Sequence, residues 1–316
     1  MTDTQLQLEP AVRRSRFYRY VRDFRRNKYI YLMLLPVFGF FVIFHYMPMY
    51  GAVIAFKDFR PGLGILGSPW VGFSHFAAFF RSFYFFRLVR NTILLNVYDI
   101  VWGFPAPIIF ALLLNEIRNA PFKRSVQTLS YLPYFLSMVV VCGLIVDFTS
   151  RTGFINDIVE FFGGSRRNWL GQEAWFRTIY VSSNIWQNLG WGSIIYLAAI
   201  STIDPQLYES AVIEGAGRWK QTRYITIPCI VPTITILLVL RIGALMTVGF
   251  EKILLLYSPL VYETADVIAT FVYRKGILEN DYSYSAAIGL FNSVIGFSLI
   301  VTANWLSKRV SETSLW

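Results

Sequence analysis

The apolar residues of this 316-residue chain fall into runs close to twenty long. A helix needs about 20 apolar residues to cross roughly 30 Å of hydrocarbon, and inside lipid it satisfies its own backbone hydrogen bonds. Charged residues make up 15% of the chain, whereas soluble domains carry about 25%. These features predict an all-α polytopic membrane protein and argue against a soluble domain.

Six apolar runs are long enough to span a membrane. Hydropathy places these spans at 29–50, 91–114, 125–148, 178–202, 227–250 and 284–306. Proline removes a backbone donor, and neighbouring helices can satisfy the carbonyl that this frees. We therefore expect bends at the prolines inside the spans, namely Pro36, Pro105, Pro107, Pro133 and Pro232.

The segment 1–28 is strongly basic, with eight Lys and Arg residues. Its apolar residues recur at helical spacing, at Phe17, Tyr20, Val21 and Phe24. This pattern predicts a helix lying on the inner leaflet. No small-residue cleavage site follows the first apolar run, so we expect a retained anchor rather than a signal peptide.

The distribution of Lys and Arg predicts the orientation. With the N-terminus inside, the cytoplasmic segments hold eight, three, three and two of them, and the external loops hold five, four and three. This excess favours cytoplasmic N- and C-termini, and it accounts for the net charge of +10 without nucleic acid. The chain then divides into a basic segment 1–28, a transmembrane domain 29–306 and a cytoplasmic tail 307–316.

Chemistry on a substrate is not predicted. The chain has no GxxxxGK[ST] phosphate-binding loop, no HExxH pattern and no Ser/His/Asp or paired-carboxylate constellation. Cys142 and Cys229 lie in apolar runs without metal-ligand spacing. We expect a non-catalytic chain that holds no metal and binds no cofactor.

The predicted cytoplasmic loop 204–228 has a structure of its own. Asp204 is a suitable N-cap and Pro205 fits the first helical position. An apolar ridge at helical spacing follows, formed by Leu207, Tyr208, Ala211 and Val212. Gly215 is expected to end or bend this short helix, because glycine adopts positive φ without strain. An apolar ridge outside the membrane needs a partner surface.

This loop resembles the EAA signature of ABC importer permeases, which reads E-A-A, three residues, G, nine residues, I-x-L-P. Every spacing matches, with Ser210 in place of the first alanine, Glu214 where aspartate is common and Ile227 in place of leucine. The matching positions and their neighbours are Glu209, Ser210, Ala211, Glu214, Gly215, Ala216, Ile225 and Pro228. Segments such as Phe44–Gly51, Gly190–Ala199 and Arg241–Met246 resemble the oligosaccharide and polysaccharide branch of these permeases.

The resemblance implies a division of labour among several chains. The loop would be a coupling helix seated on an ATPase, and ATP and Mg would be used by two ATP-binding cassette subunits. A second related permease subunit would complete the pathway, and an extracytoplasmic solute-binding protein would deliver an oligosaccharide. The location implied is the bacterial cytoplasmic membrane, where the remaining partner is lipid.

Polar residues lie on single faces of three predicted spans, toward their outer halves. Polar groups in hydrocarbon face a bundle interior or a watery cavity. They predict a substrate pathway, with helix–helix packing as the alternative. The candidate pathway residues are Asn96, Asp99, Asn184, Gln187, Asn188, Trp191, Arg241 and Asn292.

Two charges lie deep in the predicted spans. Asp99 and Arg241 both fall roughly 12–13 Å from the outer surface at 1.5 Å per residue. An unpaired charge there costs at least about 2.5–3.5 kcal/mol. Either the two residues form an ion pair, or Arg241 faces the cavity alone and attracts an acidic sugar; backbone carbonyls are a third partner.

Two other kinds of protein remain as alternatives. A self-contained secondary transporter would show internal repeats, and none is convincing here. A membrane-embedded enzyme would need the missing catalytic constellation.

Overall fold

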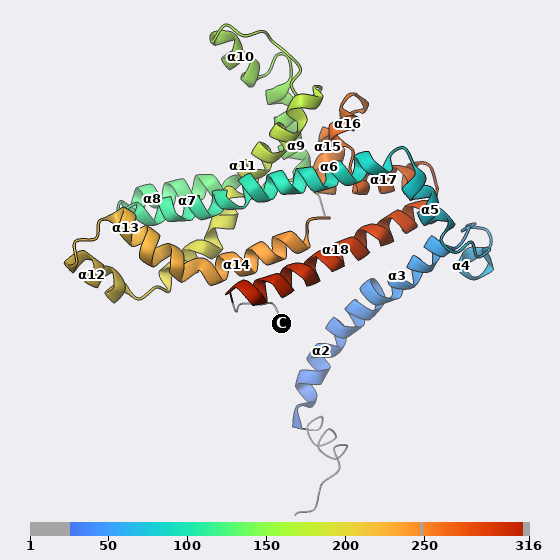
Figure 1. Cartoon of the computed structure of the whole chain (residues 1–316), viewed down its shortest axis with the longest axis horizontal. Coiled ribbons are helices and arrows are strands. Elements are labelled where there is room, and N and C mark those ends of the chain that lie inside the picture. Colours follow the sequence, from blue (N-terminus) through green and yellow to red (C-terminus); the bar gives the residue numbers. More distant parts are fainter. Residues whose placement is uncertain (1–25, 247–248, 312–316) are drawn as a thin grey trace, which may run out of the picture. The chain divides into compact units, whose positions relative to one another are not determined.

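The computed structural model describes residues 26–246 and 249–311 (Figure 1). All elements in these ranges are helical, and one isolated bridge joins Lys57 to Trp70. The predicted all-α class is therefore confirmed. The helix predicted from Phe17 to Phe24 lies outside the described residues.

The helices follow one another with few long connections. In chain order they are α2 (Lys28–Phe41), η1 (Val42–Tyr46), α3 (Met47–Met49), η2 (Tyr50–Phe56), α4 (Gly64–Gly67), α5 (Ser74–Arg81), α6 (Phe85–Tyr98), η3 (Asp99–Gly103), α7 (Pro105–Glu116), α8 (Ala120–Tyr131), η4 (Leu132–Phe135), α9 (Met138–Thr149), α10 (Phe154–Phe161), α11 (Glu173–Ser201), α12 (Pro205–Ile213), α13 (Arg218–Gln221), η5 (Thr222–Thr226), α14 (Ile227–Gly243), α15 (Phe250–Leu256), η6 (Pro259–Val261), α16 (Tyr262–Ala265), α17 (Ile268–Tyr273), η7 (Arg274–Leu278) and α18 (Tyr282–Ser311).

The described residues form two compact units, one that ends at Val53 and one that begins at Ile54. In the first unit, α2 buries none of its side chains. Large apolar residues such as Met33 and Phe38 are 76% and 71% exposed. A surface this apolar requires lipid or a partner around it, as expected for the first span.

Five helices among the described residues are long and apolar enough to cross a membrane. They run over Lys28–Phe56, Phe85–Glu116, Met138–Phe161, Arg218–Gly243 and Tyr282–Trp305. The remaining predicted span, 178–202, lies in α11, which at 29 residues is about 44 Å long. α11 is therefore long enough to cross a membrane, but its polar residues make it less apolar than the five helices above.

The span predicted at 125–148 is wrong as a single helix. α8 stops at Tyr131, and Leu136 and Ser137 are extended before α9 begins. Pro133 contributes to the break because it lacks an amide hydrogen, and the Ser137 side chain caps α9 by accepting from the Val140 amide. The apolar segment consequently starts at Met138.

The span predicted at 227–250 is displaced. The helix at this position runs from Arg218 to Gly243. Ala244–Met246 form a turn after this helix, and α15 is a separate helix. The span predicted at 91–114 is longer than expected, because α6, η3 and α7 join into one helix. Its π-helical turn η3, in which the Phe104 amide donates to the Asp99 carbonyl, lies just before Pro105.

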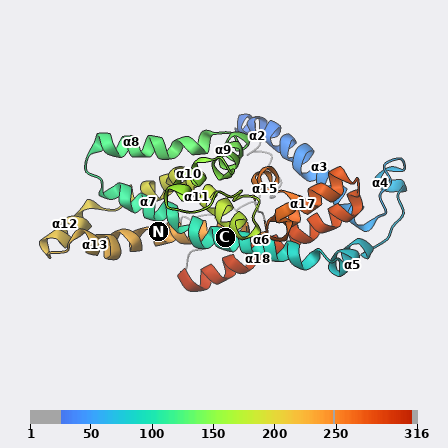
Figure 2. The ribbon, with the colours of Figure 1, turned by 90° about the horizontal axis from the view of Figure 1, so that it is seen from above.

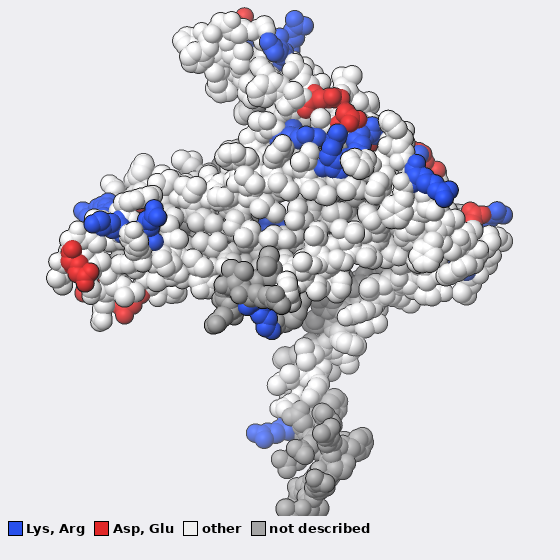
Figure 3. Space-filling model, viewed as in Figure 1, with Lys and Arg blue, Asp and Glu red and all other residues white. Residues whose placement is uncertain are grey.

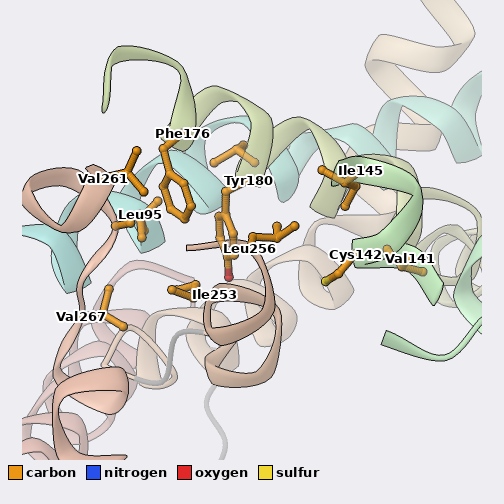
Figure 4. Close-up of a cluster of buried hydrophobic side chains, with 12 residues drawn as sticks. Leu95, Val141, Cys142, Ile145, Phe176, Tyr180, Ile253, Leu256, Val261 and Val267 are labelled. Carbon is orange, nitrogen blue, oxygen red and sulfur yellow. The ribbon is translucent and has the colours of Figure 1, made fainter. Parts of the chain in front are cut away.

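The second unit is held together around α11. α11 packs most extensively against α7, and α14 packs against α18. α11, α9, α15 and α6 share a buried apolar cluster that includes Phe176, Tyr180, Ile145, Ile253 and Leu95 (Figure 4). A Cβ on Gly190 would lie 2.3 Å from the Ser130 carbonyl oxygen. Glycine therefore allows α11 to approach α8 closely.

Charged residues of the second unit gather over α12 and α13 and, apart from these, over α6, α10 and α16 (Figure 3). α12 and α13 lie together at one end, beyond α7, in both ribbon views (Figure 1 and Figure 2). Figure 3 shows charged residues at that end and over α6 and α16, with a largely uncharged surface between them. This distribution suits a molecule whose middle lies in hydrocarbon.

Candidate functional site

A cavity of about 790 Å³ opens beside α11. Its wall is built by α6 and η3, α7, η4, α11 and α14. Of the eight candidate pathway residues, all but Asn292 line it, namely Asn96, Asp99, Asn184, Gln187, Asn188, Trp191 and Arg241. Residues far apart in the sequence thus meet at one site.

Asp99 and Arg241 form an ion pair. The Asp99 side chain is 6% exposed, and that of Arg241 is 48% exposed. The second Asp99 oxygen accepts a hydrogen bond from the Asn184 amide nitrogen. The predicted pairing is confirmed, and it satisfies a carboxylate that would be costly to bury alone.

The position of Asp99 depends on its own turn of helix. Asp99 is the first residue of η3, and Gly103 is the last. A Cβ on Gly103 would come within 2.9 Å of the Asp99 Oδ1 atom. Glycine at 103 therefore leaves room for the carboxylate to turn toward Asn184 and Arg241.

The polar network continues along α11. The Asn188 amide nitrogen donates to the Asn184 side-chain oxygen over 3.0 Å and to the Asn184 carbonyl over 2.9 Å. Positions four residues apart share one helix face. The Asn184 side chain therefore both donates to Asp99 and accepts from Asn188.

An aromatic platform forms part of the cavity wall. The ring of Trp191 stacks on Tyr134 with centroids 4.6 Å apart and planes 6° apart, and Phe135 meets Trp191 edge-on. Sequence analysis missed Tyr134. The break at η4 puts this residue on the wall, and only Pro133 hinted at that break.

Lys252 was also missed, because it was counted in an external loop. It is 2% exposed, and its Nζ lies 3.3 Å from the Gln187 Oε1 atom. Its apolar neighbours in sequence gave the only signal of burial. α15 carries this cation to the back of the cavity wall.

Asn292 is the candidate pathway residue that lies apart from this cavity, and its role in a pathway stays a prediction. Its amide donates to the Met246 carbonyl over 3.1 Å, and it does not line the cavity. Thr92, one turn before Asn96 on α6, likewise accepts from the Ile268 amide over 3.1 Å. These contacts correspond to the helix–helix packing alternative.

A second group of charges joins three elements near the start of α6. Asp266 is fully buried and accepts from Arg87 over 3.3 Å and from Arg274 over 2.7 Å. Asn91, also fully buried, donates to the Asp266 carbonyl and accepts from Arg177 over 2.9 Å. These contacts join α6 and α11 to Asp266, just before α17, and to η7, although the Nε atoms of Arg87 and Arg177 are buried without a hydrogen-bond partner.

Loop 204–228 has the local geometry that its sequence predicts. The Asp204 side chain accepts from the Gln206 amide over 2.9 Å, and Pro205 is the first residue of α12. Gly215 has φ +76°. The Ala216 amide donates to the Ala211 carbonyl over 2.8 Å, which closes a Schellman turn.

The two halves of this loop are tied together. The Tyr208 and Thr226 hydroxyls are 2.9 Å apart, and the Gln221 side chain donates to the Ala216 carbonyl over 2.7 Å. Arg218 lies 3.5 Å from Glu116 at the end of α7. The loop is therefore a compact unit attached to a membrane-crossing helix.

The outer surface of the loop is exposed. Leu207 and Val212 are 48% and 62% exposed, and Ile213 is 88% exposed. Of the positions matching the EAA signature, the exposed ones are Glu209, Ser210, Glu214, Gly215 and Pro228, and the half-buried ones are Ala211, Ala216 and Ile225. An apolar surface of this kind suits a protein partner.

Known proteins similar to this chain are permeases of importers. The family model described as "Binding-protein-dependent transport system inner membrane component" matches residues 103–312. Protein LplB of Bacillus subtilis (strain 168) is 45% identical over 293 residues, which cover 92% of each chain. The polygalacturonan/rhamnogalacturonan transport system permease protein YteP of the same organism is 46% identical over 292 residues, covering 92% of this chain and 91% of YteP.

Solved structures agree with these sequence matches. A crystal structure of a bacterial ABC transporter involved in the import of the acidic polysaccharide alginate contains a chain that matches with a TM-score of 0.87 and 46% identity, over 93% of this chain and 99% of that one. A second structure holds the alginate transporter in complex with an alginate pentasaccharide-bound periplasmic protein, and it matches with a TM-score of 0.86 and 45% identity. The chain therefore belongs to the family of binding-protein-dependent transport system inner membrane components, the non-catalytic permease subunits of ABC importers.

Proposed function

We propose that this subunit forms half of the translocation pathway for an oligosaccharide, which an extracytoplasmic solute-binding protein delivers. The observation that carries the proposal is the cavity of about 790 Å³ with amides on one part of its wall and the Trp191–Tyr134 platform on another. Amides bind sugar hydroxyls, and aromatic faces pack on the C–H surfaces of sugar rings. Relatives named for polygalacturonan and alginate support an oligosaccharide as cargo.

The other half of the pathway comes from a second, related permease subunit. Two ATP-binding cassette subunits bind ATP and Mg on the cytoplasmic side, and α12 is the coupling helix that seats on one of them. The exposed apolar ridge of α12 and the rigid turn at Gly215 support this role. This subunit itself binds no cofactor.

The proposed topology has six spans, with α11 as the fourth and with both termini in the cytoplasm of a bacterial cell. α11 tolerates its polar residues because Asn184, Gln187 and Asn188 face the cavity rather than lipid. In this orientation α12 and α13 lie on the cytoplasmic side. The charge group around Asp266 lies on the outer side.

Co-purification tests the assembly. An affinity tag on this chain, expressed with its genomic neighbours, should capture an ATPase and a second permease after mild detergent extraction. Loss of the ATPase on introducing Val212→Asp, a charge on the exposed ridge of α12, would support the coupling role. A chain that transports solute while purifying alone would instead be a secondary transporter.

Truncating the cavity wall should weaken transport without preventing assembly. Trp191→Ala removes the platform, and Asn188→Ala removes a polar end of the network. We expect each to raise the saccharide concentration for half-maximal uptake by about ten-fold, which corresponds to about 1.4 kcal/mol of lost binding. The measurement is initial uptake rate against saccharide concentration in reconstituted vesicles.

Trp186→Ala is the matched control for Trp191→Ala. Trp186 lies on the same helix and is 44% exposed, close to the 42% of Trp191, but it does not line the cavity. Its replacement should leave the concentration dependence unchanged. Equal effects of both substitutions would contradict a pathway role for Trp191.

A further inference from the structure

Lys252 lies behind the cavity wall without an anionic partner. None of the ion pairs among the described residues includes it. Its ammonium donates to the Gln187 Oε1 atom over 3.3 Å and lies 5.9 Å from the centre of the Tyr180 ring. Both Gln187 and Tyr180 line the cavity. One layer of side chains therefore separates an uncompensated positive charge from the ligand space.

This contact fixes how Gln187 presents its amide. An ammonium group has donors and no acceptor, so the Gln187 carbonyl oxygen must face Lys252. The amide nitrogen, with two N–H donors, is the polar group that remains for a ligand. Without Lys252 the amide could rotate and present its oxygen instead.

Around Asp99 the acceptors of the cavity wall are occupied, and Arg241 adds further donors. Both Asp99 oxygens are taken, by Arg241 and by Asn184, and the Asn184 oxygen accepts from Asn188. Arg241 carries five N–H donors, and its side chain is 48% exposed. The charged side chains that line the cavity are Asp99 and Arg241, and Lys252 lies directly behind the wall, so that two cations accompany one anion. Such a cavity is complementary to an anionic acceptor, such as the carboxylate of a uronic acid.

We propose that Lys252 is a positioning residue that makes this cavity select saccharides bearing carboxylates. It holds the Gln187 N–H donors toward the ligand and adds an unpaired positive charge behind them. The inference rests on the proposed function, because it specifies the cargo of the same cavity.

Equilibrium binding to the detergent-solubilised complete complex, without the solute-binding protein, tests the inference. The two probes are a uronic-acid trisaccharide and the same trisaccharide with its carboxylates reduced to primary alcohols. The wild type should bind the acidic probe more tightly. Lys252→Met should reduce this preference by about ten-fold, the equivalent of one charge-assisted hydrogen bond, while affinity for the reduced probe changes little.

Gln187→Glu is the second variant, and it has nearly the same shape as the wild type. It gives Lys252 an ion-pair partner, so a loss of stability is not expected, but it replaces the N–H donors with carboxylate oxygens. It should abolish the preference for the acidic probe. The control is Lys275→Met, which removes a lysine that is paired with Glu279 and does not line the cavity. It should keep the wild-type preference.

The ratio of the two affinities separates selection from a merely structural role, because general destabilisation would weaken both probes alike. A wild type without preference, or variants that keep it, would overturn the inference. Failure of the proposed function would be recognised separately, as the absence of ATP-dependent uptake of any oligosaccharide by the wild-type complex.

Discussion

Gly215→Leu should abolish uptake while leaving the subunit folded in the membrane. Gly215 has φ +76°, and an L-residue pays about 1–2 kcal/mol for the left-handed conformation. Opening the Schellman turn would relieve this strain, but it would break the hydrogen bond from the Ala216 amide to the Ala211 carbonyl. α12 would then lose its orientation relative to α13. We expect saccharide-stimulated ATP hydrolysis and uptake to fall together, measured in reconstituted vesicles.

Gly217→Leu is the matched control. Gly217 lies in the same turn, has an ordinary φ of −68° and has nothing within 4 Å of an added Cβ. The same side chain can be accommodated there without backbone strain, so uptake should be retained. Full uptake by the Gly215→Leu variant would contradict the coupling role of the loop.

Asp99→Asn should destabilise the subunit by about 2–3 kcal/mol. Breaking a buried ion pair costs about 3–5 kcal/mol because it leaves one charge uncompensated. We expect a smaller loss than for a fully buried pair because the Arg241 side chain is 48% exposed, so that water can partly solvate the charge left behind. Adding Arg241→Gln should recover part of the loss, since both charges are then gone. The measurement is the thermal unfolding of the detergent-solubilised complex for the two single variants and the double variant.

Asp147→Asn provides the control, because Asp147 is an exposed carboxylate within α9. The same chemical change there should have little effect on unfolding. If the double variant is no more stable than Asp99→Asn alone, the interaction between Asp99 and Arg241 does not contribute to the stability of the subunit. If Arg241→Gln alone unfolds normally and loses only the uptake of acidic sugars, the principal role of Arg241 is contact with the substrate.

Local chemistry explains which features could be predicted from the sequence. The Asp204 cap and the turn at Gly215 follow from what a carboxylate and a glycine can do within a few residues. Depth alone showed that Asp99 and Arg241 each need a partner or a hydrated cavity, and the structure selects the ion pair among the three alternatives. Both arguments need no knowledge of how the helices pack.

Proline shows why the helix boundaries could not all be predicted. Pro36 and Pro232 lie inside continuous helices, whereas the helix stops near Pro133. The loss of one donor is the same at each position, and neighbouring segments decide whether the helix continues. The short helix α15 was hidden in the same way, because the apolar sequence around 250 continues past the point where α14 ends.

The wall of the cavity was predicted only in part for a similar reason. The polar face of α11 is a pattern within one helix and can be read from residue spacing. Tyr134 and Lys252 reach the site through tertiary packing of η4 and α15, which no spacing encodes. Asn292 has the same local pattern as the residues that line the cavity, but its amide donates to the Met246 carbonyl.

Uptake into proteoliposomes tests the central claim most directly. The vesicles would contain the co-purified complex, ATP and Mg in the lumen, and the solute-binding protein outside with labelled oligogalacturonides or alginate oligosaccharides. We predict accumulation that requires lumenal ATP and the binding protein and persists when ionophores abolish ion gradients. Accumulation that follows an ion gradient and continues without ATP would contradict the account.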